Sequence, residues 1–147
     1  MKHEKYKVRI SKSFQRYEFH SVGPQGRILK RVEYKPMGES GAFYNLSFGD
    51  VGDDDEIDDL AVTDNKNSRK VLATVAFTVT SFLKFYPNRM IYVFGSTKAR
   101  TRLYRMGISN NLEEFQEGFN VCGLDKEWQM FKRNIGYSAF MVSNKKR

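Results

Sequence analysis

The hydrophobic pattern of this chain changes its period once, and that change determines the class of fold. In the first third, apolar and polar residues alternate along Tyr6–Ile10, Phe14–Val22 and residues 28–35. A period of two is typical of strands with one buried face. From Val71 to Tyr86 the apolar residues recur every three or four positions, which is typical of an amphipathic helix. This order predicts an α+β domain in which the helix covers one face of a sheet.

Short turns join the alternating segments, so we expect the first strands to form an antiparallel meander. Gly23-Pro24-Gln25-Gly26 is a turn sequence, because proline presets φ and glycine permits positive φ. Residues 36–41 form the next loop, and Phe43–Phe48 the strand after it. The residues expected on the buried face of these strands are Tyr17, Phe19 and Ser21, then Tyr44, Leu46 and Phe48.

The second half of the sequence predicts the long helix and several shorter helices and strands after it. Asp64 or Ser68 caps the helix, and Pro87 ends it. The remaining segments are a strand at Met90–Phe94, a helix at Thr97–Met106, a short helix opening at Asn110 with Glu113 three residues on, and closing strands at Phe119–Leu124 and Ser138–Val142. Residues 1–147 then form a single α+β domain: an antiparallel sheet of about five to seven strands, one long amphipathic helix on one face, and one or two shorter helices.

The charge of the chain is uneven. Seven of the 17 acidic residues fall between Asp50 and Asp59, within a polar loop expected at residues 49–67. Outside that decapeptide, 25 basic residues face 10 acidic ones, a net charge of +15. A body this basic attracts polyanions over about a Debye length, roughly 8–10 Å. The loop is a solvated segment, a metal site, or a cover that competes with a polyanion for the basic face; residues 144–147 are expected to be a disordered tail.

The strand-turn-helix around Gly95 is the segment that most favours a ligand. A strand that ends in glycine and small hydroxyl residues and then opens a helix presents unpaired N–H groups to an anion. On the helix, Lys98, Thr101, Arg102 and Arg105 fall within about 100° of one another. We expect Ala99, Leu103 and Met106 to pack inward, with Arg100 and Tyr104 on a third side. The predicted phosphate-binding residues are Gly95, Ser96, Thr97, Lys98, Arg100, Arg102, Tyr104 and Arg105.

Better-known phosphate sites do not fit this segment. The P-loop pattern is absent, a single glycine is not a dinucleotide fingerprint, and no paired aspartates follow as in nucleotidyltransferases. The plainer alternative is a tight turn and a solvated helix whose arginines pair with the acidic loop.

The supply of catalytic residues is small, and no catalytic residue is assigned. The two histidines are His3 and His20, and the single cysteine, Cys122, lies in an apolar strand pattern. No zinc spacing or EF-hand frame is present, so we expect no metal site and no cofactor, with Asp53, Asp55 and Asp58 as a loose alternative. An enzyme here would be a small metal-independent ribonuclease using residues such as His20, Arg100, Arg102 and Tyr104.

These features favour a nucleic-acid-interacting domain, with RNA or single strands preferred as the partner. A ribonuclease or toxin-like enzyme, and a protein-interaction module that docks an acidic partner, are the alternatives. No apolar run is long enough to span a membrane, and the first residues contain no signal sequence. A single cysteine fits a reducing compartment, so we expect the cytoplasm. Nothing in the sequence indicates the oligomeric state.

Three segments resemble a family of short uncharacterised proteins found mainly in Bacteroidetes. They are Tyr44–Asp50, Val71–Val75 and the stretch from Gly95 to Tyr104, and the resemblance runs over most of the chain. The family has no established activity. The resemblance therefore implies a bacterial cytoplasmic domain and assigns no catalytic residue.

Overall fold

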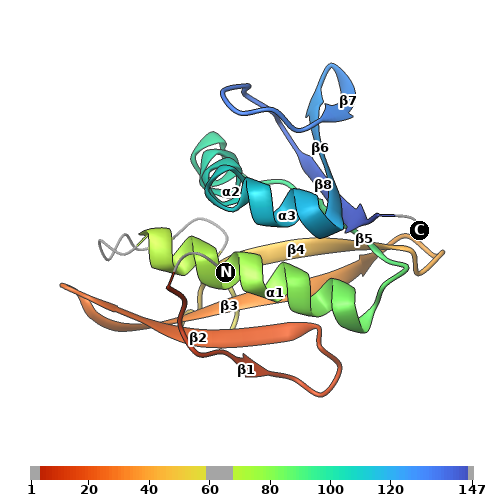
Figure 1. Ribbon diagram of the computed structural model, residues 1–147. Helices are drawn as coiled ribbons and strands as arrows, with labels where there is room; N and C mark the ends of the chain where they lie inside the picture. Colours follow the sequence, from red (N-terminus) through yellow and green to blue (C-terminus); the bar gives the residue numbers. More distant parts are fainter. Residues whose placement is uncertain (1–3, 59–67, 146–147) are drawn as a thin grey trace.

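A computed structural model describes residues 4–58 and 68–145, which form one mixed sheet with three helices (Figure 1). The strands are β1 (Arg9–Ile10), β2 (Arg16–Gly23), β3 (Gly26–Met37), β4 (Phe43–Asp50), β5 (Met90–Val93), β6 (Phe119–Asp125), β7 (Glu127–Met130) and β8 (Phe140–Asn144). The helices are α1 (Ser68–Phe85), α2 (Lys98–Asn110) and α3 (Leu112–Gly118). The strand order is β1-β2-β3-β4-β5-β8-β6-β7. The α+β class is confirmed.

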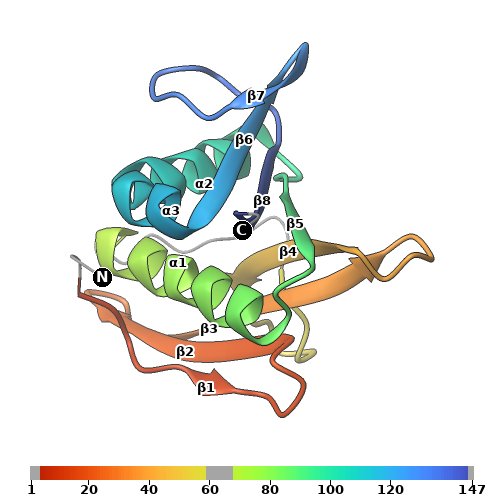
Figure 2. The same ribbon diagram turned by 45° about the vertical axis from the view of Figure 1, so that its right-hand side comes forward.

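The sheet curves around its helices, and all three lie on its inner face (Figures 1 and 2). α1 covers the half built from β2, β3 and β4, while α2 and α3 lie against the half that contains β6 and β8. α1 also packs against α2, and α3 contacts β6. None of the described helices is long and apolar enough to cross a membrane.

All neighbouring strands pair antiparallel except β4 and β5, which run parallel with Leu46 opposite Val93. Parallel neighbours need a long crossover connection, and the segment from Asp50 to Met90, which includes α1, makes it. β5 ends at Val93, whereas β4 continues to Asp50. The end of β4 therefore lies beside the turn that leads into α2.

Aromatic rings from the sheet and α1 form the centre of the core. The Phe82 ring of α1 stacks on Tyr34 at 4.3 Å and meets Tyr44 edge-on at 5.1 Å. The hydroxyl groups have partners: Tyr34 shares a 2.8 Å hydrogen bond with Thr78, and Tyr17 donates to Ser81 at 3.1 Å. Burial raises the pKa of Tyr34 well above its ordinary value. The predicted buried faces of β2 and β4 are confirmed: Tyr17, Phe19, Ser21, Tyr44, Leu46 and Phe48 are all buried.

Several predicted boundaries were wrong. The sheet has eight strands rather than five to seven, because Glu127–Met130 forms β7, an edge strand too short to show a period. The first strand covers only Arg9–Ile10, since the Tyr6 N–H group donates to Thr74 of α1 instead of a strand partner. Asn110 belongs to α2, and Asn111 is the residue that joins α2 to α3.

The C-terminal tail also starts later than expected. Asn144 is part of β8, and its amide donates to the carbonyl oxygens of Leu83 and Pro87 at 3.0 and 2.9 Å. Of the two caps considered for the long helix, Ser68 is its first residue. Asp64, the loop from residue 59 to 67 and residues 146–147 lie outside the described residues.

We expect Gly123→Ala to destabilise the fold. A Cβ at Gly123 would lie 2.4 Å from Cγ of the Tyr137 ring, and overpacking of this kind costs about 1–3 kcal/mol. Gly118→Ala is the matched control, because nothing lies within 4 Å of the added atom, and it should be neutral or slightly stabilising. Urea unfolding of both variants measures the difference. Equal unfolding midpoints would show that Tyr137 does not pack on Gly123.

Candidate functional site

The predicted strand-turn-helix lies at the carboxyl ends of β4 and β5. β4 ends here at Asp50, and the turn after β5 leads into the first turn of α2. In open α/β sheets, ligands bind beyond the carboxyl ends of parallel strands. The one parallel pair among the described strands thus coincides with the segment that the sequence singled out.

The turn itself is built on close backbone packing. A Cβ on Gly95 would lie 2.5 Å from the backbone nitrogen of Thr101, so only glycine allows the turn to approach the first turn of α2 this closely. Thr97 is the N-cap, and its hydroxyl accepts from the Arg100 N–H group at 3.2 Å. Ser96 and Thr97 are exposed, so the turn meets solvent.

The buried face of α2 differs from the predicted one. Of the expected packing face, only Leu103 packs against the core, where it is half-buried; Ala99 is exposed and Met106 is 43% exposed, so these two predictions were wrong. The buried residues are instead Arg100, Tyr104, Gly107 and Ile108. Gly107 allows α2 to pack closely on α1 through this buried face, because even a Cβ at that position would lie 3.3 Å from the Leu72 side chain of α1.

The opposite face of α2 carries a row of cations. Lys98, Arg102, Arg105 and Ser109 fall within an arc of about 60° that points directly away from the buried face. Arg133, from the loop between β7 and β8, donates to the Ser109 carbonyl oxygen at 3.0 Å and so adds a cation at the end of the row. Among the described residues none of these cations has an acidic partner. We call Lys98, Arg102, Arg105 and Arg133 the α2 cation row.

Arg100 and Tyr104 lie apart from this row, inside the protein. Arg100 is 7% exposed, and its Nη2 donates to the Tyr104 hydroxyl at 3.4 Å. Nη2 also lies 3.5 Å from where a Cβ on Gly49 would be, so the guanidinium group packs over the end of β4. Nη1 is buried and has no hydrogen-bond partner. The predicted site residues therefore divide into an exposed set and a buried pair.

Acidic residues near the end of β4 pair with the sheet. Asp50 binds Lys30 at 2.5 Å, and both the carboxylate and the carbonyl oxygen of Asp55 accept from the buried Arg31, at 2.8 and 2.7 Å. Arg31 also contacts Glu18 at 2.7 Å. Burial alone would lower the pKa of Arg31, but the hydrogen bonds that it donates to Asp55 and Glu18 outweigh burial and raise that pKa. Because of these contacts, Asp50 and Asp55 pair with Lys30 and Arg31 of β3 and not with the α2 cation row.

The other predicted chemistry is not assembled among the described residues. His20 lies on the outer face of β2, between the inward-facing Phe19 and Ser21, whereas α2 lies on the inner side. His20 is thus separated by the sheet from Arg100 and Tyr104. No three described His, Cys, Asp or Glu side chains form a group that could hold a metal ion.

The outer face of the sheet carries an aromatic strip that sequence reasoning missed. Tyr92 contacts Phe43 at 5.6 Å and Trp128 at 5.8 Å, measured between ring centroids. β8 and β6 lie between β5 and β7, so the Tyr92 and Trp128 side chains lean toward each other across two strands. Met130 beside them is 70% exposed. The sequence did contain a signal for this strip. Met90–Phe94 is apolar at every position rather than at alternate ones, so apolar side chains lie on the outer face of the strand as well as on the inner one.

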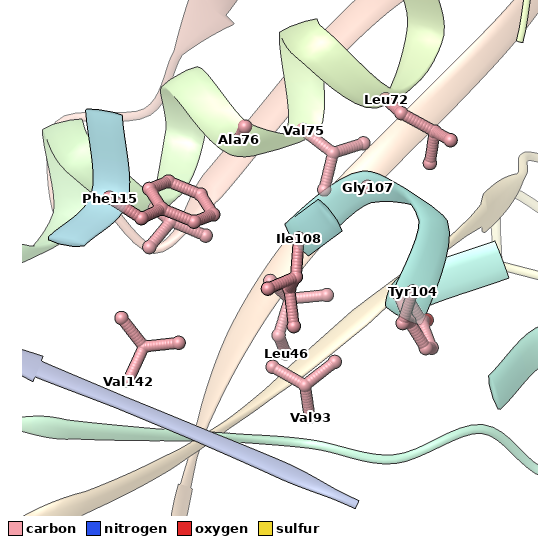
Figure 3. Close-up of a pocket in the computed structure, with 11 residues that line it drawn as sticks. Leu46, Leu72, Val75, Ala76, Val93, Tyr104, Gly107, Ile108, Phe115 and Val142 are labelled. Atoms are coloured by element: carbon pink, nitrogen blue, oxygen red, sulfur yellow. The ribbon is translucent and has the colours of Figure 1, made fainter. Parts of the chain in front are cut away.

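A small apolar cavity lies behind the site, between α1, α2 and the sheet (Figure 3). Its volume is about 40 Å³, and Figure 3 shows side chains of all these elements pointing into it. Residues that line it include Leu46, Val75, Val93, Ile108, Phe115 and Val142. A space this small and apolar holds no nucleotide or substrate, so we interpret it as a packing defect where the two halves of the curved sheet meet.

The chain belongs to a family of unknown function (DUF6934), whose model matches residues 2–145. Neither the curated proteins nor the solved structures contain a match. Membership in a family without an established activity, expected from the sequence, is thereby confirmed, whereas the match does not address the expected restriction to Bacteroidetes.

We expect Val142→Ile to stabilise the fold. The added methylene enters the cavity, and burying it contributes up to about 0.8 kcal/mol. Val22→Ile is the control, because Val22 also lies on a strand but is 56% exposed. Thermal unfolding compares the two, and a lower melting temperature for Val142→Ile than for the parent would show that the space cannot accept the group.

Proposed function

We propose that this protein is a nucleic-acid-binding domain that holds the phosphates of RNA or another single strand along the α2 cation row. The observation that carries the proposal is a row of cations on the side of α2 away from its buried face, Lys98, Arg102 and the half-buried Arg105, extended by the exposed Arg133 of the β7–β8 loop. None of them has an acidic partner among the described residues. Three of the four are arginines, whose planar guanidinium groups match phosphate oxygens with two parallel hydrogen bonds.

The distribution of charge supports the proposal. The chain has a net charge of +8, and Asp50 and Asp55 bind Lys30 and Arg31 rather than the row. The row spans about 16 Å from Lys98 to Ser109, at 1.5 Å per residue. An uncompensated line of cations of this length attracts and orients a phosphate backbone.

An exposed ring in the turn before α2 favours an unpaired strand over a duplex. Phe94 directly precedes Gly95 and is 46% exposed. Aromatic rings stack on bases that are splayed out of a helix, and base pairs in a duplex do not offer that face.

The outer face of the sheet favours a second candidate function, a protein-interaction module. Phe43, Tyr92, Trp128 and Met130 form a partly exposed apolar strip on a face that no described helix covers. Apolar patches of this kind often mark protein contacts. This candidate would be preferred if purified protein recovers another protein, and no nucleic acid, from lysate.

We also place the protein in a bacterial cytoplasm. The one cysteine, Cys122, is free and half-buried, which suits a reducing compartment.

Binding to a labelled single-stranded RNA should weaken steeply with salt. If all four cations contact phosphates, log affinity should fall with log salt at a slope of about −3, which is 0.7 for each phosphate. The double variant Arg102→Gln, Arg105→Gln should reduce that slope by about 1.4. Fluorescence anisotropy from about 50 to 200 mM salt measures it.

The control for this experiment removes the same charge elsewhere. Arg27→Gln changes an exposed arginine at the start of β3, distant from α2 in the fold, and should leave the slope unchanged. A parent protein that does not bind RNA at the lowest salt would overturn the proposed function. A slope equal in the double variant and the parent would exclude the α2 cation row as the binding surface.

A further inference from the structure

The edge strand β7 has one open backbone side. It is the last strand in the sheet order, and among the described strands it pairs only with β6. The Phe131 N–H group donates to the Val121 carbonyl oxygen at 2.9 Å, so the odd-numbered residues of β7 direct their N–H and C=O groups toward β6. The backbone groups of Trp128 and Met130 therefore point to the open side, where the Met130 carbonyl oxygen also accepts from the Tyr137 hydroxyl at 3.4 Å. An open strand edge can pair with a further strand.

The side chains at the same two positions are large, apolar and exposed. Trp128 is 38% exposed and Met130 is 70% exposed. Both lie on the outer face of the sheet, where the Trp128 ring contacts Tyr92. The aromatic strip that begins at Phe43 therefore ends on the last strand. The β6–β7 hairpin projects from the body of the protein, so a second molecule can reach this edge (Figures 1 and 2).

The opposite edge of the sheet is protected against such pairing. β1 contributes only Arg9 and Ile10, and the Arg9 guanidinium group lies 4.0 Å from the Glu18 carboxylate of β2. The chain before β1 turns onto α1, where the Tyr6 N–H group donates to the Thr74 hydroxyl at 2.8 Å. Very short strands and charged side chains are common means of protecting an edge. β7 instead presents two exposed apolar side chains, so it is the edge on which we expect a partner.

We propose that the protein forms a two-fold symmetric dimer through β7, in which the β7 strands of two copies pair antiparallel with Trp128 opposite Trp128 of the second copy. The two Trp128 residues exchange both of their backbone hydrogen bonds across the axis. Their rings become cross-strand neighbours on the outer face, and aromatic pairs of this kind stabilise a sheet. The two aromatic strips then form one continuous strip across the dimer.

The charges of β7 select this register. Only even-numbered residues point outward, so the axis can pass through one residue or the next, but not between them. With the axis at Trp128, Glu127 faces Gln129 of the second copy. Lys126 then faces a methionine, so no like charges meet.

The two neighbouring registers place like charges directly opposite each other, which is destabilising. With the axis at Glu127, the two Glu127 carboxylates face each other. With the axis at Gln129, Lys126 faces Lys132. The strand is therefore complementary to itself in one register, as a two-fold interface requires, and this is the reason for assigning the edge to a second copy.

The interface is small, because it consists of one short strand and its side chains from each copy. Interfaces below the standard size are typical of weak and transient complexes, so we expect the dimer at high protein concentration. None of the paired positions belongs to the α2 cation row. The inference therefore does not rest on the proposed function, and either can fail without the other.

The first experiment uses the parent protein and its single tryptophan, Trp128. Sedimentation from about 1 µM to 1 mM protein should show the mean mass rising from that of one chain toward that of two. Over the same range, quenching of the Trp128 emission by acrylamide should fall, because the partner covers the ring. A monomer at every concentration, or a dimer in which quenching does not change, would overturn the proposal.

The second experiment places opposite charges at one exposed position. Met130 faces Lys126 of the second copy in the proposed register, and it is 70% exposed, so substitutions there should not disturb the fold. Met130→Lys places like charges opposite each other at two symmetric positions and should raise the Kd of the dimer by about 2- to 30-fold. Met130→Glu places opposite charges there and should keep the Kd close to that of the parent.

The control separates the register from the net charge. Val22→Lys and Val22→Glu make the same changes at a residue that is 56% exposed on β2, near the other end of the strand order, and both should keep the parent Kd. Equal Kd values for Met130→Lys and Met130→Glu would overturn the proposed pairing. A difference between the two Val22 variants as large as that between the two Met130 variants would overturn it as well.

A rescue variant completes the comparison. Met130→Lys combined with Lys126→Glu restores opposite charges across the axis and should return the Kd toward the parent value. A Kd that stays as high as that of Met130→Lys alone would contradict the pairing of residue 126 with residue 130.

Discussion

Parallel strands cannot be joined by a tight turn, so the pairing of β4 with β5 forces the chain to leave the sheet after Asp50 and to return across its face. α1 is part of that return, and its Phe82 ring lies on Tyr34 and Tyr44. The same pairing directs the end of β5 toward the end of β4, so that α2 begins where both strands stop. The covered core and the position of α2 at the ends of β4 and β5 therefore both follow from the direction of β5 relative to β4.

Two buried cations of β3, Lys30 and Arg31, take up the carboxylates at and beyond the end of β4. Lys30 and Arg31 are adjacent on β3 and point to opposite faces, yet each reaches a carboxylate at or just beyond the end of β4. Removing one partner of such a pair leaves a bare buried charge, which costs about 3–5 kcal/mol. Asp50 and Asp55 are thus committed to holding the end of β4 and the turn after it against the sheet. This commitment is the reason that Asp50, although β4 ends beside the turn before α2, pairs with Lys30 and not with the α2 cation row.

Sequence reasoning predicted the elements whose apolar residues follow a single regular spacing. Alternation identified the inner faces of β2 and β4, since each buries every second residue, and the three- and four-residue spacing identified α1. It failed at α2, because a hydropathy pattern treats Arg100 as a surface residue, whereas its stem and Tyr104 form the buried face. Arg133 could not be predicted as part of the cation row, because its contact with Ser109 depends on how the β7–β8 loop packs in three dimensions.

The cations of α2 lie in two different environments, since Arg100 is buried and Lys98 and Arg102 are exposed. Cations on a solvated helix face attract a polyanion but discriminate weakly, because each contact is screened and the side chains are mobile. A guanidinium group buried at the start of the same helix is instead held inside the protein, where Arg100 contacts the Tyr104 hydroxyl and lies away from solvent. Gly95 makes both possible, because the close packing of its turn against Thr101 fixes the first turn of α2, from which the two sets point in opposite directions.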